Sequence, residues 1–294
     1  MSLRVHTALF TVALLFSANY VMSKMGMRQF SPMAFAWLRI AGATLILAVL
    51  VRGDAPLSRE DKRRVAGFAI LAVVINAPLF LLGLSLTSVH VAAILITTIP
   101  VFTVAAAIAF GREKKSATRI GGIALAGFGA LLVVGGESFA GTWRSVLGAL
   151  LIVINCLSYA LYLVISKPAM ARLSPRRVVA HMFAVGTVIL LPIAALPLAR
   201  QDWQSLTTSA WVTLALVIAG PTITAYLLQA WALRHADSSV VATYTYVQPV
   251  LASILGAIFF GETLHPIVIF AAIVIFTGVW LAGKTPSAAI VPPT

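Results

Sequence analysis

Charged residues are scarce in this sequence of 294 residues. Only 10% are Asp, Glu, Lys or Arg, whereas 61% are hydrophobic, and the mean hydropathy is +1.01. A water-soluble domain of this length does not need so much apolar surface, so lipid must be the main solvent of the chain. The apolar residues form continuous segments and do not alternate with polar ones. This pattern favours membrane-spanning helices over a transmembrane β-barrel.

Cysteine is nearly absent as well, and sequence motifs of catalysis are missing. The single cysteine, Cys156, has no disulfide partner and lies in an apolar run, which indicates a core position rather than redox chemistry. The sequence contains neither GxSxG nor HExxH, and its five histidines are scattered without metal-ligand spacing. We therefore expect no enzyme activity, no metal and no cofactor. A membrane-embedded enzyme or a sensor is the alternative from a different class.

Acidic residues are missing from the middle of every apolar segment. The eight that exist fall in loops or at segment ends: Asp54, Glu60, Asp61, Glu113, Glu137, Asp202, Asp237 and Glu262. This argues against a carrier that selects cationic drugs through a buried carboxylate, and against ion coupling through an acid at the membrane centre. The expected cargo is neutral, zwitterionic or anionic where it binds. Energy coupling is left between facilitated diffusion and weak proton coupling.

Basic residues outnumber acidic ones by 21 to 8, for a net charge of +13. They flank apolar segments and do not form one face, so they indicate membrane topology and not a nucleic-acid partner. When loops are assigned to alternate sides, one side receives only Lys24, Arg28, Arg144 and Arg200. Arg39 lies within a span, and all other basic residues fall on the opposite side. Since the positive side faces the cytoplasm, both termini are predicted to be cytoplasmic.

The apolar pattern predicts an all-α integral membrane protein with ten transmembrane helices. In the first half we expect spans at 5–24, 33–51, 66–86, 91–110 and 119–136. In the second half we expect spans at 146–166, 178–199, 210–232, 239–260 and 266–283. The chain thus divides into residues 1–140, residues 141–284 and a disordered tail at 285–294.

The two halves carry the marks of a duplication. Three residues of the first half recur 149 positions later: Pro100, Glu113 and Gly129 as Pro249, Glu262 and Gly278. Ser23-Lys24 and Ser31-Pro32 recur 143 positions later as Ser166-Lys167 and Ser174-Pro175. The second copy has therefore gained about six residues between its first and fourth helices. The repeat also includes the apolar segment after Arg4, so we expect this segment to be retained and not cleaved as a signal peptide.

A five-span unit that is repeated must insert its second copy upside down. The loop at Arg112–Arg119 carries four basic residues, whereas its counterpart at Gly261–Pro266 carries none, as two copies that face opposite sides should show. Inverted repeats are a known way to build an alternating-access transporter. Ten spans in one chain suffice for a pathway, so we expect a functional monomer.

Polar and aromatic residues recur at helical spacing within several predicted spans. Asn155, Tyr159 and Tyr162 share one face of the sixth span, and four further spans show similar pairs. Each pair by itself is typical of helix packing, but together they suggest a pocket with an aromatic lining and amides for polar groups. The predicted substrate-binding residues are Asn19, Tyr20, Arg39, Asn76, Phe80, Tyr159, Tyr162, Tyr226, Gln229, Tyr244 and Gln248.

Arg39 and two prolines are the remaining candidates. Arg39 could reach a membrane interface, bond helix carbonyls or bind a substrate carboxylate. Pro100 and Pro249 occupy equivalent places within spans, where each removes a backbone hydrogen bond. They are predicted either to kink their helices only or to act as hinges for rocking between access states.

Several segments resemble the bacterial drug/metabolite transporter superfamily, in its ten-span EamA-type branch. They are NYVMSK at 19–24, Ser31-Pro32, Leu38-Arg39, SYALYLVISKP at 158–168 and ALRHADSSVVATYTYVQPVLASILGAIFFGETL at 232–264. The resemblance covers about residues 5–283. It implies a ten-helix inverted-repeat exporter with a central cavity, in which Asn19, Arg39, Pro100, Pro249 and Glu262 occupy recurrent family positions. The first-half turn, TSVHVAAILITTIP, departs from the family pattern.

The resemblance also suggests the cargo. Members of the superfamily export amino acids, nucleosides or related metabolites, and the YddG-like aromatic and neutral amino-acid exporters are similar to this chain in size. We therefore expect an exporter in the bacterial inner membrane that moves neutral or aromatic amino acids, or related small metabolites. Nucleosides, sugars or hydrophobic drugs are the alternative cargoes on the same scaffold.

Overall fold

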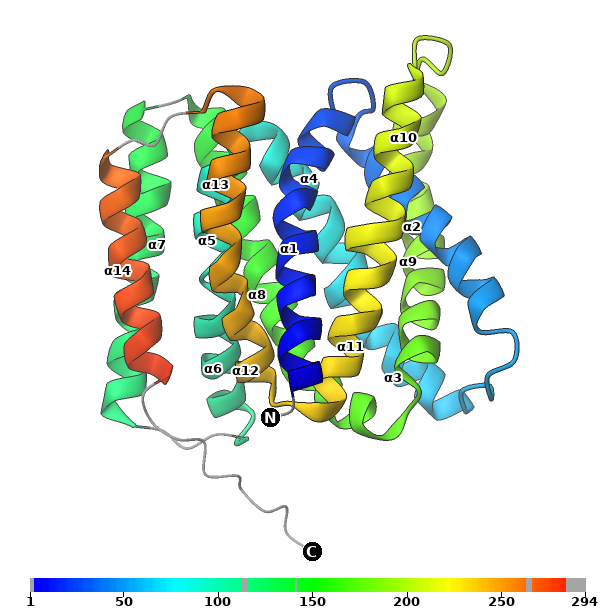
Figure 1. The fold of residues 1–294 in the computed structure, drawn as a ribbon, viewed down its shortest axis with the longest axis horizontal. Helices are drawn as coiled ribbons and strands as arrows, with labels where there is room; N and C mark the ends of the chain where they lie inside the picture. The colour runs from blue at the N-terminus through cyan, green and yellow to red at the C-terminus, as the bar shows by residue number, and fades with distance from the viewer. Residues whose placement is uncertain (1–2, 113–115, 141, 263–265, 284–294) are drawn as a thin grey trace, which may run out of the picture.

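The computed structural model describes residues 3–112, 116–140, 142–262 and 266–283 (Figure 1). Every regular element in these ranges is a helix, which confirms the predicted all-α class. The predicted disordered tail, 285–294, lies outside the described residues, as does Glu113 of the sequence repeat.

The described residues of the first half form seven α-helices and a π-helical segment. They are α1 (Leu3–Gly26), α2 (Pro32–Leu50), α3 (Arg59–Ala69), η1 (Ile70–Ile75, π), α4 (Asn76–Leu86), α5 (Val89–Ile96), α6 (Ile99–Ala109) and α7 (Ala117–Ala140). The second half repeats this series with one additional 3₁₀ turn. Its elements are α8 (Trp143–Arg172), α9 (Pro175–Ala199), α10 (Thr208–Val217), η2 (Ile218–Thr224, π), α11 (Ala225–His235), α12 (Ser238–Thr243), η3 (Tyr244–Tyr246, 3₁₀), α13 (Val247–Phe260) and α14 (Pro266–Gly283).

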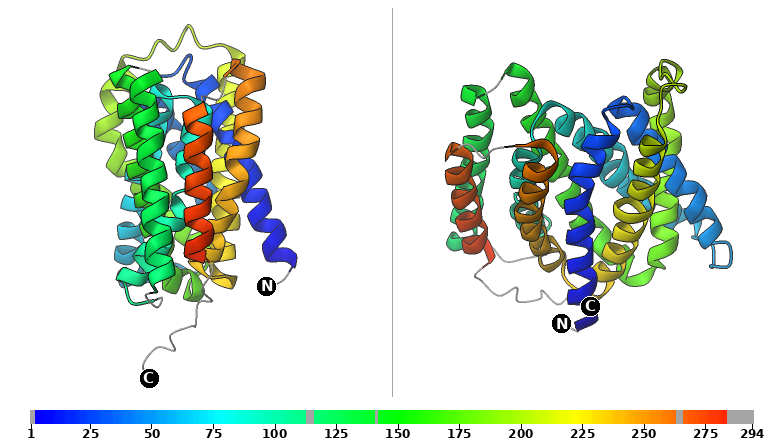
Figure 2. Two further views of the ribbon diagram at one scale, coloured as in Figure 1. Left: turned by 90° about the vertical axis from the view of Figure 1, so that its left-hand side faces the viewer. Right: turned by 45° about the horizontal axis from the view of Figure 1, so that its top comes forward.

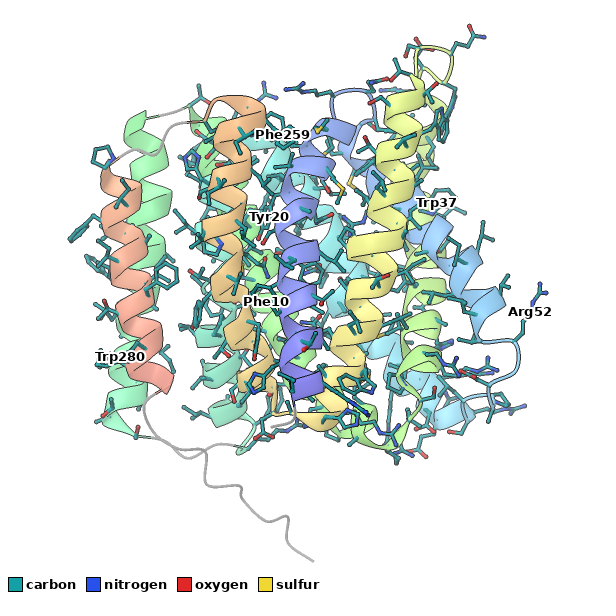
Figure 3. The ribbon with its side chains drawn as sticks, viewed as in Figure 1. Phe10, Tyr20, Trp37, Arg52, Phe259 and Trp280 are labelled. Atoms are coloured by element: carbon teal, nitrogen blue, oxygen red, sulfur yellow. The ribbon has the colours of Figure 1, made fainter. Side chains whose placement is uncertain are left out.

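Within the described ranges, eight continuous helical stretches are long and apolar enough to cross a membrane. They are Leu3–Gly26, Pro32–Leu50, Arg59–Leu86, Val89–Ala109, Trp143–Arg172, Pro175–Ala199, Thr208–His235 and Ser238–Phe260. The fifth and tenth predicted spans correspond to α7 and α14, within which only the shorter apolar stretches Ile120–Leu132 and Ile269–Gly278 stand out. Large apolar side chains face outward on several helices, including Phe10, Phe259 and Trp280 in Figure 3. This is the surface that a lipid environment requires.

Equivalent helices of the two halves run in opposite directions. In Figure 1, α1 runs upward from the N-terminal end of the bundle and its counterpart α8 runs downward; α2 and α9 show the opposite pair of directions. The start of α1 and the end of α14 lie at the same end of the bundle. The structure therefore shows the antiparallel relation of the halves that the charge pattern predicted.

The length difference between the halves lies in one helix. The stretch Arg59–Leu86 corresponds to Thr208–His235, residue for residue at an offset of 149. By contrast, α2 has 19 residues and α9 has 25, although both begin at the repeated Ser-Pro pair. The six additional residues of the second copy thus extend the far end of α9.

Four of the long stretches are interrupted near their middle, at matching places in the two halves. The π segments η1 and η2 occupy equivalent positions, and α5 and α6 are separated at Thr97 and Thr98, where the second half has the 3₁₀ turn η3. Hydroxyl groups bond the carbonyls beside these breaks: Thr98 Oγ1 donates to Leu95 O at 2.7 Å, and Thr245 Oγ1 to Ala242 O at 2.8 Å. Such bonds allow irregular backbone at membrane depth.

Helices α7 and α14 form a pair at one edge of the molecule, as both Figure 1 and Figure 2 show. The repeated glycines Gly129 and Gly278 lie in their contact. A Cβ added to Gly278 would come within 2.4 Å of Ala126 N, and one added to Gly129 within 2.9 Å of Ile275 N. Neither position has room for a side chain, so the glycines let the two backbones approach closely.

Candidate functional site

A cavity lies between the two halves of the bundle. Its described lining comes from both halves: Phe16, Asn19, Tyr20, Arg39, Asn76, Ala77, Phe80, Ile96, Ile99, Asn155, Tyr159, Tyr226, Thr245 and Gln248. Its volume is about 60 Å³, less than the roughly 150 Å³ of a cavity that holds benzene in a protein core. The cavity in this state is therefore contracted and must widen to hold an aromatic molecule.

Four pairs of equivalent positions face this cavity from opposite sides. At the repeat offsets of 143 and 149 they are Phe16 with Tyr159, Ala77 with Tyr226, Ile96 with Thr245, and Ile99 with Gln248. The cavity thus lies on the axis that relates the two copies, where inverted-repeat transporters bind their substrates. In each pair the first-half residue is apolar and its second-half counterpart bears a hydroxyl or an amide. The scaffold is symmetric, but the chemistry of its cavity is not.

Hydrogen bonds join the polar lining across distant helices. Tyr20 Oη on α1 donates to Gln248 Oε1 on α13 at 3.0 Å. Tyr226 Oη donates to Ala72 O at 3.0 Å, and Asn155 Nδ2 to Asn76 O at 2.8 Å. The last two bonds reach carbonyls in and just after the π segment η1, where the backbone departs from the regular α-helical bonding pattern. These side chains therefore support the irregular backbone of the cavity wall.

Aromatic rings form the apolar part of the wall. Tyr20 and Phe80 meet edge to face, with 5.4 Å between ring centroids, and Figure 3 marks Tyr20 on α1. Tyr226 makes similar contacts with Phe16 and Tyr159, at 6.2 and 6.4 Å. Edge-to-face packing leaves ring faces and edges for a flat apolar ligand. The wall thus combines aromatic surface with amide and hydroxyl groups.

Eight of the eleven predicted binding residues line the cavity, and three do not. Gln229 and Tyr162 lie behind Tyr159: Gln229 Oε1 accepts the Tyr159 hydroxyl, and the Tyr162 ring centroid is 5.6 Å from that of Tyr159. Tyr244 bonds His6 Nδ1 through its hydroxyl and lies apart from the cavity. The sequence placed Tyr244 on the face of Gln248, but the tighter 3₁₀ turn at Tyr244–Tyr246 rotates it away from the helical phase.

Sequence reasoning did not assign six of the lining residues. They are Phe16, Ala77, Ile96, Ile99, Asn155 and Thr245. Asn155 shares a helical face with Tyr159, and this spacing could have included it. The other five all belong to the equivalent pairs described above, so applying the repeat offset to Tyr159, Tyr226 and Gln248 would have found three of them, Phe16, Ala77 and Ile99.

The repeated prolines lie directly after the breaks in their spans. Pro100 is the second residue of α6, after the interruption at Thr97 and Thr98, and Pro249 is the third residue of α13, after η3. In the first turn of a helix proline loses no hydrogen bond, so these prolines begin new helical segments and do not kink continuous ones. Whether the breaks move as hinges is still a prediction.

An ionic cluster joins the two halves at the end of the bundle where α1 ends. Glu262, just after α13, bonds Lys24 Nζ at 2.7 Å through Oε1 and His90 Nδ1 at 3.1 Å through Oε2. Its carboxylate also accepts the backbone N–H of Val89 at 2.9 Å and caps the N-terminus of α5. Lys24 donates in addition to Thr87 O at 3.1 Å.

The surroundings of Glu262 favour its ionised form. Burial opposes ionisation, but hydrogen bonds from His90, Lys24 and the Val89 backbone outweigh it and lower the pKa of Glu262 to about 2. The carboxylate therefore stays charged throughout the physiological range, and the cluster holds α1, α5 and α13 together at this end.

The second half repeats part of this cluster at the opposite end. Lys167, the counterpart of Lys24, donates to Leu233 O at 2.7 Å and to Ala236 O at 2.6 Å. Ala236 is the repeat equivalent of Thr87, so each lysine holds the end of the third long stretch in its own half. The cavity thus lies between two lysine-centred contacts, one toward each end of the bundle.

One string of the sequence has the spacing of a phosphate-binding loop. Gly278, Gly283, Lys284 and Thr285 fit GxxxxGKT, of which Lys284 and Thr285 lie outside the described residues. Gly278 to Gly283 continue α14, where the backbone is helical. A P-loop instead follows a strand and curls its N–H groups around the phosphates. The match is therefore a coincidence of spacing.

Comparisons with known proteins agree with this architecture. The model of the EamA-like transporter family matches residues 3–135 and 146–283, one match in each half. An uncharacterized transporter of Archaeoglobus fulgidus is 24% identical over 96% of this chain and 98% of its own length. YedA, an uncharacterized inner membrane transporter of Escherichia coli K12, is 26% identical over 95% and 92%. A solved crystal structure shares the fold, with a TM-score of 0.67 at 17% identity over 95% of this chain and 97% of the other.

Proposed function

Because the chain belongs to the EamA-like transporter family, we propose that it exports amino acids, with neutral and aromatic ones favoured, or related small metabolites by alternating access. The family makes it a multi-pass membrane transporter, as the resemblance predicted. The single observation that supports this cargo is the cavity between the halves, whose aromatic rings and amides suit a flat apolar group with polar ends. The inner membrane is the proposed location, in keeping with YedA.

The proposed mechanism alternates the contacts at the two ends of the cavity. Lys24 and Glu262 join the halves at one end, and the breaks beside Pro100 and Pro249 lie at the cavity wall. Opening one end requires the long broken stretches to tilt relative to the other half, which would also widen the contracted cavity. Both halves of the chain contribute to the cavity wall, and we propose that a monomer carries out this cycle.

Efflux from proteoliposomes tests the cargo. Vesicles that contain the purified protein should release labelled phenylalanine, tryptophan or leucine faster than empty vesicles. A panel of unlabelled nucleosides, sugars and hydrophobic drugs in the same assay separates the alternative cargoes by competition. If no neutral or aromatic amino acid leaves faster than from empty vesicles, the proposed cargo is wrong.

Two variants test whether this amino-acid efflux depends on the cavity. We expect Gln248→Leu to reduce amino-acid efflux at least about tenfold, because it replaces a polar cavity group and leaves the Tyr20 hydroxyl unpaired. Gln204→Leu is the matched control, since Gln204 is exposed in the loop before α10. If the two variants show equal efflux, the cavity does not take part in amino-acid transport.

We also infer ten membrane crossings with both termini in the cytoplasm. The start of α1 and the end of α14 lie at one end of the bundle, which also carries the arginine-rich segments around Arg52 and Arg172 (Figure 3 marks Arg52). Alkaline phosphatase fused to the C terminus should therefore be inactive, and a fluorescent protein fused there should fluoresce. The reverse result would contradict this topology.

A further inference from the structure

Arg39 is a buried cation at the cavity, and one of its hydrogen-bond donors is unused among the residues that the structure describes. Its side chain lines the cavity although only 6% of the residue is exposed. Nε donates to Thr222 Oγ1 at 3.2 Å, whereas the buried Nη1 has no hydrogen-bond partner within the described part of the chain. A buried charged donor without an acceptor is costly. Such a group is stable only if something else supplies the acceptor.

The protein itself supplies no anion to Arg39 among its described residues. The carboxylates that form ion pairs have partners toward the ends of the bundle: Asp54 pairs with Arg176, Glu60 with Arg64, Asp61 with Arg172, and Glu262 with Lys24. None of the described lining residues is acidic. Among the described lining residues there is therefore one fixed positive charge and no fixed negative charge to balance it.

The backbone around Thr222 is a second observation that indicates a binding role for Arg39. Thr222 lies in the π segment η2, which follows α10 in the middle of the stretch Thr208–His235. Single π segments are rare, and they are frequent at functional sites because they displace side chains from the helical register. Here the segment places a buried hydroxyl beside Nε and so orients the guanidinium plane.

We propose that Arg39 binds the carboxylate of the cargo, and that an ammonium group on the cargo is dispensable. A guanidinium fork matches a carboxylate in charge and geometry, and the unpartnered Nη1 is the donor it would use. The ring pair Tyr20–Phe80 then accepts the apolar part of the molecule. This inference rests on the proposed transport function and narrows its substrate class to apolar or aromatic monocarboxylates.

The same charge balance determines which molecules are rejected. The described lining offers an ammonium only neutral amide, hydroxyl and carbonyl oxygens, which contribute less than a carboxylate would. An amine that lacks a carboxylate also leaves Arg39 unpaired and adds a second positive charge at low dielectric. The cavity should therefore discriminate by the acid group and tolerate loss of the amine.

Three probes with the same phenyl ring test this on the wild-type protein. Thermal stabilisation of the purified protein in detergent is measured with phenylalanine, 3-phenylpropionate and phenethylamine. We expect 3-phenylpropionate to bind within about threefold of phenylalanine, and phenethylamine at least about tenfold more weakly, since a hydrogen bond to a charged group is lost. Equal binding of phenethylamine, or no binding of 3-phenylpropionate, would overturn the proposal.

Variants assign the preference to Arg39. Arg39→Gln should reduce the ratio of acid to amine affinity about tenfold or more, whereas Arg63→Gln, at an exposed position on α3, should retain the wild-type ratio. A purely structural role of Arg39 would lower both affinities without changing their ratio. If Arg39→Gln does not fold, the ratio of acid to amine affinity of the wild-type protein still tests whether the cavity recognises the carboxylate. This assay measures binding and not transport. The carboxylate preference can therefore be absent while amino-acid efflux is observed, and it can be present while efflux is not.

Discussion

Glu262→Gln should lower the free energy of unfolding by about 2–3 kcal/mol. The substitution keeps the shape of the side chain but removes the charge that bonds Lys24, His90 and the Val89 backbone. Breaking a buried pair costs about 3–5 kcal/mol, and solvent around the partly exposed Lys24, at 26%, reduces that figure. Chemical denaturation in detergent micelles measures the change.

The control for this variant is Glu60→Gln. Glu60 is 73% exposed and pairs with Arg64 one helical turn away, an arrangement worth about 0–1 kcal/mol. Glu262→Gln should therefore be clearly the more damaging of the two. Equal losses would mean that the cluster at the end of α1 does not hold the halves together.

The same cluster gives the Glu262 effect a defined pH dependence. The folded state lowers the pKa of Glu262 from 4.5 to about 2, so ionised Glu262 stabilises the fold fully above pH 4.5. As the pH falls from 4.5 toward 2, the unfolded state binds the proton first and this stabilisation is lost. The difference between the wild type and Glu262→Gln should hence diminish as the buffer is made more acidic than pH 4.5.

Gly278→Val should be the other large effect, at about 3 kcal/mol of lost stability. Even a Cβ at this position would approach Ala126 N to 2.4 Å and Gly122 O to 2.7 Å, and both are backbone atoms of α7. Backbone atoms cannot rotate away as a side chain can, so α14 has to move off α7. The thermal unfolding midpoint of the variant in detergent would show the loss.

A second glycine of the same helix pair provides the comparison. A Cβ added to Gly127 on α7 meets nothing within 4 Å, so Gly127→Val should cost less than about 1 kcal/mol. If both variants are equally unstable, the loss comes from valine in the helix and not from the α7–α14 contact. Neither glycine lines the cavity, so the ligand preference assigned to Arg39 should survive in the folded fraction.

Hydropathy predicted the helical segments closely because it measures compatibility with lipid. The predicted spans 33–51 and 266–283 differ from α2 and α14 by at most one residue. The same pattern contained no sign of the π segments or of the break at Thr97 and Thr98. Breaks change which carbonyls are bonded but not how apolar the segment is, and this is why composition does not report them.

Sequence reasoning predicted eight of the lining residues, and the failure of helical spacing at Tyr244 has a cause in the backbone. Tyr162 and Gln229, by contrast, lie behind Tyr159 on regular helices. Asn76 and Phe80 share a face of α4, as expected, and both reach the cavity. Tyr244 and Gln248 were expected to behave in the same way, but the 3₁₀ turn at Tyr244–Tyr246 separates them. Predicting that two residues share a helix face assumes a constant rotation angle per residue. One tighter turn between them is enough to make that prediction wrong.

The sequence by itself determined the membrane class, the duplication, its inversion and the absence of acids from the spans, because these depend on composition, spacing and charge. Only the tertiary structure decided that Tyr20 meets Gln248 across 228 positions, that Glu262 bonds Lys24, and that equivalent residues of the halves face one cavity. It also decided that Arg39 has a buried donor with no acceptor in the described part of the chain. Such pairings depend on how helices rotate and pack, and distances along the chain do not encode that.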